Sequence, residues 1–181
     1  MKNLVMGVAK GYGWDILEPF VTSFAKNCRS AELVLFVDDI SDFTRDRLIQ
    51  AGVWLQNFPD DLKSGIPNNT RWKVFADFLE IHGDAYEQIF ITDTRDVIFQ
   101  SDVFAAFGGL KNYLGLTTEA DDIGGSKTGD RINYDWLVDC FGKAAADKLL
   151  DKKIICDGTV IGTTAEMKIF AAKMWQAVSA A

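Results

Sequence analysis

The sequence contains a single histidine, and this limits the catalytic chemistry that it can support. His82 is the only histidine in 181 residues, so a Ser-His-Asp triad or a multi-histidine metal site would have to be built around it. It follows, at helical spacing, the apolar residues Val74, Phe75, Phe78 and Leu79. This pattern favours a position at the edge of the core over a role in catalysis.

Cysteines are also scarce, and their spacing excludes two common site types. The three cysteines, Cys28, Cys140 and Cys156, are odd in number and form no closely spaced pair. Disulfide frameworks and zinc sites need even numbers or short paired spacings. We therefore expect reduced, buried thiols.

Long apolar runs and an excess of positive charge are both missing. No apolar run approaches the roughly 20 residues of a membrane span. The apolar segment 4–9 is broken too early by Lys10-Gly11 for a signal peptide, so we expect a cytoplasmic location. The net charge of −7 argues against nucleic acid as the main partner. A small anionic ligand remains compatible, because arginines and a metal ion can reverse the local field.

The remaining composition is that of a globular domain, with 48% hydrophobic and 12% aromatic residues. Strand and helix patterns alternate along the chain. The expected strands cover 4–9, 33–37, 53–55, 89–92, 113–118 and 159–163, and the expected helices cover 15–28, 43–51, 70–81, 134–150 (interrupted near Gly142) and 165–181. Residues 57–69 and 119–130 have loop composition, and the second of these is expected to be mobile. The alternation predicts an α/β fold with a mostly parallel mixed sheet and helices on both faces.

Helix starts are indicated by polar residues at capping positions. Asp15 with Glu18, and Thr163 with Glu166, have the spacing of capping boxes. Thr70 is expected to cap the helix over 70–81.

Polar residues follow three of the predicted strands. Gly11-Tyr12-Gly13 comes after the first strand, Asp38-Asp39 after the second, and Asp93 and Asp96 after the fourth. In open α/β sheets, ligands bind beyond the carboxyl ends of the strands. These residues therefore predict a binding site at one edge of the sheet.

The segment after the fourth strand is the most informative. Asp93 and Asp96 can reach one ligand only if the strand ends by about Thr92 and a turn follows, because side chains three apart on a strand face opposite ways. Manganese or magnesium could then bind carboxylate oxygens, phosphate oxygens and water. Arg95 could bind phosphate, or form a salt bridge with Asp93 or Asp102. The alternative is a helix-capping aspartate in a solvated turn.

Residues 93–104 resemble the acidic motif of a family of nucleotide-sugar glycosyltransferases with the GT-A fold. The sequence Asp-Thr-Arg-Asp-Val-Ile-Phe-Gln, then Asp-Val-Phe, is similar to the pattern Asp-x-Arg-Asp-Val-x-Phe-Gln, then Asp-Pro-Phe. Thr94 stands where the Asp-x-Asp motif of the fold has its first aspartate, and Val103 replaces the proline. The opening strand with its Lys-Gly-Tyr turn, and residues 33–39, 71–72 and 157–163, resemble the same fold in order.

The resemblance implies a single Rossmann-like GT-A domain over 1–181, with or without a C-terminal acceptor-binding extension. It implies a metal-dependent, hexosyltransferase-like enzyme that moves a sugar from a nucleoside-diphosphate donor to a saccharide, lipid or protein acceptor. The residues assigned by position are Asp96 and Asp93 for Mn²⁺ or Mg²⁺, Gly11, Tyr12, Asp38 and Asp39 for the nucleoside, Arg71 and Arg95 for the diphosphate, and Asp157 and Gly158 for the sugar or acceptor, with Asp157 nearest the reacting sugar.

Three other classes of protein stay open at this point. A receiver domain would use the acidic pair Asp38-Asp39 with Asp93 as phosphoacceptor, although receivers place that pair after their first strand. A phosphatase of the haloacid-dehalogenase type would need Asp-x-Asp-x-Thr early in the chain. A non-catalytic nucleotide or sugar binder of the same fold is the third alternative.

Overall fold

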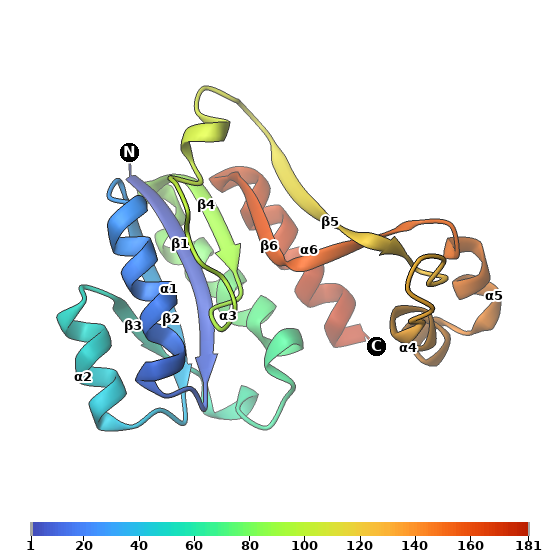
Figure 1. Cartoon of the computed structure of the whole chain (residues 1–181), viewed down its shortest axis with the longest axis horizontal. Helices are drawn as coiled ribbons and strands as arrows, with labels where there is room; N and C mark the ends of the chain where they lie inside the picture. Colours follow the sequence, from blue (N-terminus) through green and yellow to red (C-terminus); the bar gives the residue numbers. More distant parts are fainter. Residues whose placement is uncertain (1, 181) are drawn as a thin grey trace. The chain divides into compact units, whose positions relative to one another are not determined.

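A computed structural model describes residues 2–180, which form an α/β fold around one mixed sheet (Figure 1). The strand order is β3-β2-β1-β4-β6-β5, with parallel pairing from β3 to β4 and antiparallel pairing of β6 with β4. The strands are β1 (Lys2–Lys10), β2 (Ala31–Asp38), β3 (Trp54–Asn57), β4 (Tyr86–Thr92), β5 (Leu114–Asp122) and β6 (Lys153–Thr163). The predicted mostly parallel mixed sheet is confirmed.

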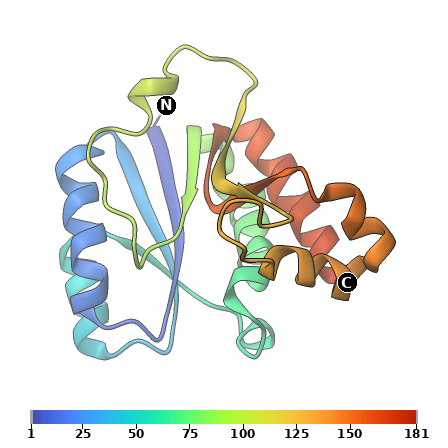
Figure 2. The same ribbon diagram turned by 45° about the vertical axis from the view of Figure 1, so that its right-hand side comes forward.

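Helices cover both faces of the sheet, as predicted. Figure 2 shows α1 and α2 on one face and α3 and α6 on the other. The helices are α1 (Trp14–Asn27), α2 (Asp42–Gln50), α3 (Pro67–His82), α4 (Ile132–Phe141), α5 (Lys143–Ala146) and α6 (Thr164–Ala180), with short 3-10 turns η1 (Asp60–Leu62), η2 (Gly83–Ala85), η3 (Ala105–Phe107) and η4 (Asp147–Leu149). The predicted interruption at Gly142 is confirmed, since this glycine lies between α4 and α5 with φ 81°.

The chain divides into two compact units. The first runs up to Gly115 and includes Gly158–Ala180, and the second is Leu116–Asp157. The first unit contains β1 to β4 and the predicted site residues directly after β1, β2 and β4. The expected extent of the domain, 1–181, stays a prediction.

Two apolar clusters lie on opposite faces of the sheet in the first unit. On β1, Leu4 and Met6 pack into the cluster on the α3 and α6 face, whereas Val5 and Ala9 pack into the cluster on the α1 and α2 face. All four residues are fully buried. A strand covered on both faces has an uninterrupted apolar sequence, and this explains why β1, β2 and β4 were recognisable.

Three predicted helix caps are wrong. α1 begins at Trp14 after Gly13, and no side chain caps it, so Asp15 lies inside the helix. α3 begins at Pro67, because proline suits the first helical position, and Thr70 instead donates its hydroxyl to the Ile66 carbonyl at 3.1 Å. The Thr163 hydroxyl is buried and has no hydrogen-bond partner among residues 2–180.

The segment predicted to be a mobile loop after residue 119 is partly strand and is tied to Asp121. β5 continues to Asp122, and the buried Asp121 carboxylate accepts the N–H groups of Asp122, Lys127 and Thr128 and the Thr128 hydroxyl. These hydrogen bonds, led by that of the Thr128 hydroxyl, hold the pKa of Asp121 well below its usual range.

The expectations for histidine and cysteine are met in part. His82 packs against Trp54 and Phe78, with ring centroids 5.1 and 4.6 Å away, at the edge of the core as predicted. All three cysteines are free thiols, but only Cys28 is buried. Burial raises the pKa of the Cys28 thiol. The prediction of burial is wrong for Cys140, which is exposed near the end of α4.

Candidate functional site

A buried threonine fixes the turn that carries the two candidate metal ligands. β4 ends at Thr92, as the chemistry of the turn required, and the Asp93 N–H donates to the Gly158 carbonyl at 2.9 Å. Thr94 is 2% exposed and donates its hydroxyl to the Val8 carbonyl at 2.8 Å. Its methyl group fills the space beside Gly7, where a Cβ would lie only 2.4 Å from Thr94 Cγ2. Gly7 is therefore required for Thr94 to anchor the turn.

The turn lines a cleft at the carboxyl ends of β1 and β4, which we call the β1–β4 cleft. It has a volume of about 230 Å³ and is lined by Val8, Lys10, Tyr12, Pro67, Asn68, Arg71, Asp93, Thr94, Arg95 and Asp96. The structure thus brings together five of the predicted site residues: Tyr12, Arg71, Asp93, Arg95 and Asp96. Three cationic side chains and two carboxylates give the cleft a formal charge of +1 in a chain of charge −7. The lining is therefore less negative than the chain as a whole and is compatible with an anionic ligand.

Arg71 is the buried cation of this cleft. It is 4% exposed, and its Nη1 lies 2.6 Å from Asp93 Oδ1. A guanidinium removed from water needs such a partner, and the Asp93 side chain keeps 44% of its surface exposed for a further ligand. The carboxylate is thus held in place by Arg71 while its exposed side remains accessible to solvent.

Arg95 does not form the salt bridge that the sequence left open. It is exposed on the β1–β4 cleft, and within residues 2–180 it makes no ion pair with Asp93 or Asp102. Asp102 instead accepts the Phe104 N–H at 3.0 Å. The Arg95 guanidinium is therefore available to an anionic ligand.

Asp38 and Asp39 line a second cleft, at the carboxyl ends of β2 and β3, which we call the β2–β3 cleft. Its volume is about 490 Å³, and it is lined by Val37, Asp38, Asp39, Ile40, Arg45, Asn57, Phe58, Pro59, Asp60 and Lys63. Asp39 has φ 51°, an uncommon conformation for a residue other than glycine. The Gly11 N–H donates to the Asp38 carbonyl at 3.0 Å, and Gly11 has φ 70°, so the predicted turns after β1 and β2 are joined.

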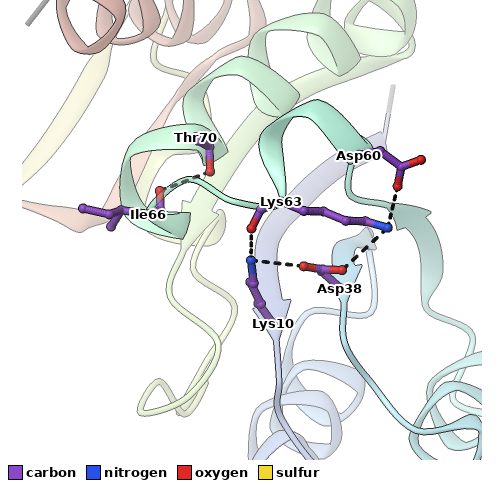
Figure 3. Close-up of polar contacts among 6 residues, drawn as sticks. All are labelled: Lys10, Asp38, Asp60, Lys63, Ile66 and Thr70. Atoms are coloured by element: carbon purple, nitrogen blue, oxygen red, sulfur yellow. Dashed lines mark hydrogen bonds and ion pairs between the residues drawn. The ribbon is translucent and has the colours of Figure 1, made fainter.

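A chain of ion pairs connects the residues of the two clefts (Figure 3). Lys10 Nζ, in the β1–β4 cleft, lies 3.1 Å from Asp38 Oδ2 and also donates to the Lys63 carbonyl oxygen. Lys63 Nζ lies 3.9 Å from Asp38 Oδ1 and 2.6 Å from Asp60 Oδ1. Sequence reasoning missed Lys10, Lys63 and Asn68 as site residues. The only available signal was the position of Lys10, a charged residue at the end of a buried strand.

The residues predicted to contact the sugar, the acceptor or the base differ in how buried they are. Gly158 is buried, and its carbonyl supports the acidic turn through the Asp93 N–H. Asp157 is an exposed residue at the end of the second unit, and its catalytic role stays a prediction. Tyr12 is half-buried in the β1–β4 cleft and could contact a base, whereas the Trp14 ring is covered by Arg47, whose Cζ lies 5.0 Å from the ring centroid.

The donor set of the β1–β4 cleft fits a metal ion that is bound together with phosphate. Among residues 2–180 there is no group of three or more histidine, cysteine or acidic side chains arranged to hold a metal. Magnesium and manganese are commonly held by one or two carboxylates, with phosphate oxygens and water as the other ligands. Asp93 and Asp96 could supply the carboxylates, and the cationic side chains around them could hold the phosphates.

Comparison with known proteins supports the fold assignment. No protein-family model matches the chain, and no curated protein matches it. The apo structure of the bifunctional glycosyltransferase WbbM is similar in fold, with a TM-score of 0.55 and 12% sequence identity over 96% of this chain. The chain spans only 34% of the length of that protein. This chain therefore has a glycosyltransferase-like fold.

No helix among the described residues is long and apolar enough to cross a membrane. The expected cytoplasmic location stays a prediction.

Proposed function

We propose that this chain is a metal-dependent glycosyltransferase domain that moves a sugar from a nucleoside-diphosphate donor to an acceptor. The observation that carries the proposal is the β1–β4 cleft, which is lined by Asp93 and Asp96 together with Lys10, Arg71 and Arg95. Carboxylates for a cation and cations for phosphate are the two groups that a metal–diphosphate ligand needs. The glycosyltransferase-like fold agrees with this ligand.

Asp93 and Asp96 would hold Mn²⁺ or Mg²⁺, which supplies a positive charge where the leaving diphosphate becomes more negative. Arg71, already held by Asp93, keeps that carboxylate in one orientation. Arg95 would bind phosphate oxygens, because planar guanidinium groups bind them in pairs. Lys10 lines the same cleft and is paired with Asp38 at 3.1 Å.

The nucleoside would lie toward the turns after β1 and β2, near Gly11, Tyr12 and Asp39. The sugar or the acceptor would lie toward Gly158, whose carbonyl accepts the Asp93 N–H. The acceptor class, whether saccharide, lipid or protein, is left open by the proposal.

The receiver alternative disagrees with the topology. Receiver-type sheets have the strand order 2-1-3-4-5. The order here is β3-β2-β1-β4-β6-β5, and β6 is antiparallel to β4. In addition, Asp93 is already bound by Arg71 at 2.6 Å. A non-catalytic binder of nucleotides or sugars, and a phosphatase that uses Asp93, are left as the alternatives that an activity assay separates.

A screen of nucleotide-sugars for manganese-dependent transfer or hydrolysis tests the proposal. The wild-type chain and Asp96→Asn would be compared with and without Mn²⁺, and nucleoside-diphosphate binding would be followed by thermal shift. We expect stabilisation and turnover that need both the metal and Asp96. Metal-dependent binding without turnover would assign the chain to the non-catalytic binders. Absence of any nucleotide-dependent stabilisation would contradict the proposal.

A further inference from the structure

Three residues hold the loop that leads into α3. Lys10, at the end of β1, contacts both the Asp38 carboxylate and the Lys63 carbonyl, and the Lys63 ammonium reaches back to Asp38 (Figure 3). A single carboxylate therefore lies between two ammonium groups from distant parts of the chain. We call Lys10, Asp38 and Lys63 the lysine clasp.

Asp38, the carboxylate of the clasp, is shielded from solvent, whereas the Lys63 side chain is 43% exposed. The side chains of Lys10 and Asp38 are 29% and 12% exposed, whereas that of Asp60, which also pairs with Lys63, is 94% exposed. Exposed pairs contribute little to stability. A carboxylate with little contact to water depends on its cations. Asp38 is thus the central charge of the clasp, and Asp60 provides a matched control.

The clasp lies only a few residues before the first turn of α3. Lys63 is followed closely by Ile66, whose carbonyl accepts the Thr70 N–H at 3.0 Å and the Thr70 hydroxyl at 3.1 Å. Pro67 and Asn68, between them, line the β1–β4 cleft. The Lys63 backbone therefore directly precedes the segment that forms this part of the cleft lining.

We propose that Asp38 is a positioning residue that acts through Lys10 and Lys63 to set the wall of the β1–β4 cleft for a diphosphate. The proposal rests on the proposed function of that cleft. Asp38 lines the β2–β3 cleft and not the β1–β4 cleft. Any positioning effect on a ligand in the β1–β4 cleft would therefore pass through the lysines. This role differs from the nucleoside contact that the sequence predicted for Asp38.

Inorganic pyrophosphate with Mn²⁺ is the suitable probe, because it has no base that could touch Asp38 directly. Removing a negative charge near an anion site would by itself tighten binding. Loss of positioning would weaken binding instead, so the direction of the change in affinity distinguishes a direct charge effect from a positioning effect. By calorimetry, we expect Asp38→Asn to weaken pyrophosphate binding about five- to tenfold, the scale of one typical net hydrogen bond. Asp38→Glu should restore most of the affinity, and Asp60→Asn should leave it unchanged.

Hydrogen exchange without ligand provides a second measurement. In Asp38→Asn the amide of Thr70 should exchange about tenfold faster, since the start of α3 loses its support. The amide of Arg45, which donates to Ser41 in the first turn of α2, should not change.

The outcomes separate the two proposals. Unchanged or tighter pyrophosphate binding by Asp38→Asn, or unchanged exchange at Thr70, would overturn the positioning role. A larger loss of affinity for the free nucleoside than for pyrophosphate would also overturn it and assign Asp38 to nucleoside contact. A wild-type chain that binds neither pyrophosphate nor nucleoside diphosphates would contradict the proposed function, and the exchange rates would still decide whether Asp38 holds the loop.

Discussion

Gly7→Ala should displace the acidic turn, although Gly7 itself does not line the β1–β4 cleft. A Cβ at Gly7 would lie 2.4 Å from Thr94 Cγ2, 3.0 Å from the Thr92 carbonyl oxygen and 3.4 Å from Leu35 Cδ2. The distance to Thr94 Cγ2 is shorter than the contacts that non-bonded carbon atoms make in proteins. The Thr92 carbonyl oxygen belongs to the backbone and cannot rotate away as a side chain can. Overpacking of this kind costs about 1–3 kcal/mol. Alanine recovers roughly 0.5–1 kcal/mol over glycine within a strand.

These two terms leave a net loss of about 0–2.5 kcal/mol. A loss in the middle of that range, about 1–2 kcal/mol, should lower the midpoint of thermal unfolding by roughly 2–8 °C for a chain of this size. Manganese-dependent nucleoside-diphosphate binding should fall as well, because Asp93 and Asp96 lie on either side of Thr94. Gly108→Ala is the matched control. Its Cβ would meet no atom closer than 3.6 Å, so its stability should change by no more than about 0.5 kcal/mol.

A double-mutant cycle with Thr94→Ser tests the cause. Serine keeps the hydroxyl that donates to Val8 and removes the methyl group that collides. The cost of Gly7→Ala should therefore fall by about 1 kcal/mol in the Thr94→Ser background, measured by urea unfolding. An equal cost in both backgrounds would refute the reasoning, since it would show that the Thr94 methyl group is not what Gly7 accommodates.

Three further predictions concern single charged residues. Asp96→Asn should remove the manganese dependence of nucleoside-diphosphate binding, while the free energy of unfolding stays within about 0.5 kcal/mol of wild type because Asp96 is exposed. Unchanged manganese-dependent affinity would exclude Asp96 from the site. Arg71→Ala should cost about 1–3 kcal/mol, as it removes a buried charged hydrogen bond, and should weaken diphosphate more than nucleoside binding by calorimetry; equal losses would make Arg71 purely structural. Asp121→Asn should be less stable than wild type at neutral pH, since hydrogen bonds lower the pKa of Asp121 in the folded state. The lowered pKa stabilises the folded state at pH values above 3.8, the pKa of this carboxyl in the unfolded chain, and the stabilisation is lost as the pH falls below that value. The difference between wild type and Asp121→Asn in the free energy of unfolding by urea should therefore be constant down to about pH 4 and shrink below it. A difference that grows on acidification would contradict this assignment.

Much of the fold could be predicted because the buried strands have simple sequence patterns. β1, β2 and β4 are covered on both faces, so each is a continuous apolar run. The rule that ligands bind at the carboxyl ends of parallel strands then located the acidic turn. Helix starts were less predictable. Pro67 indicated that α3 begins one turn before Thr70, but the adjacent loop composition concealed this signal.

The contacts inside the site could not be predicted, because they join residues that are distant in sequence. Arg71 meets Asp93 across 22 positions, and Lys10 meets the Lys63 carbonyl across 53. No local pattern specifies which lysine or arginine reaches which carboxylate. Only the sheet topology, which places β2 and β4 on either side of β1, brings these side chains to one edge.

The position of Thr94 explains why the acidic motif has its carboxylates three residues apart. The structure turns this side chain inward, 2% exposed, with its hydroxyl donating to the Val8 carbonyl at 2.8 Å. An aspartate there would place a carboxylate against a carbonyl oxygen, so Thr94→Asp should cost about 3–5 kcal/mol as an unpaired buried charge. Urea unfolding measures that cost, and calorimetry with Mn²⁺ and pyrophosphate should show weaker binding, although the variant restores the Asp-x-Asp spacing. Unchanged stability with tighter metal-dependent binding would mean that residue 94 faces the ligand, and the inward anchor assigned to Thr94 would be wrong.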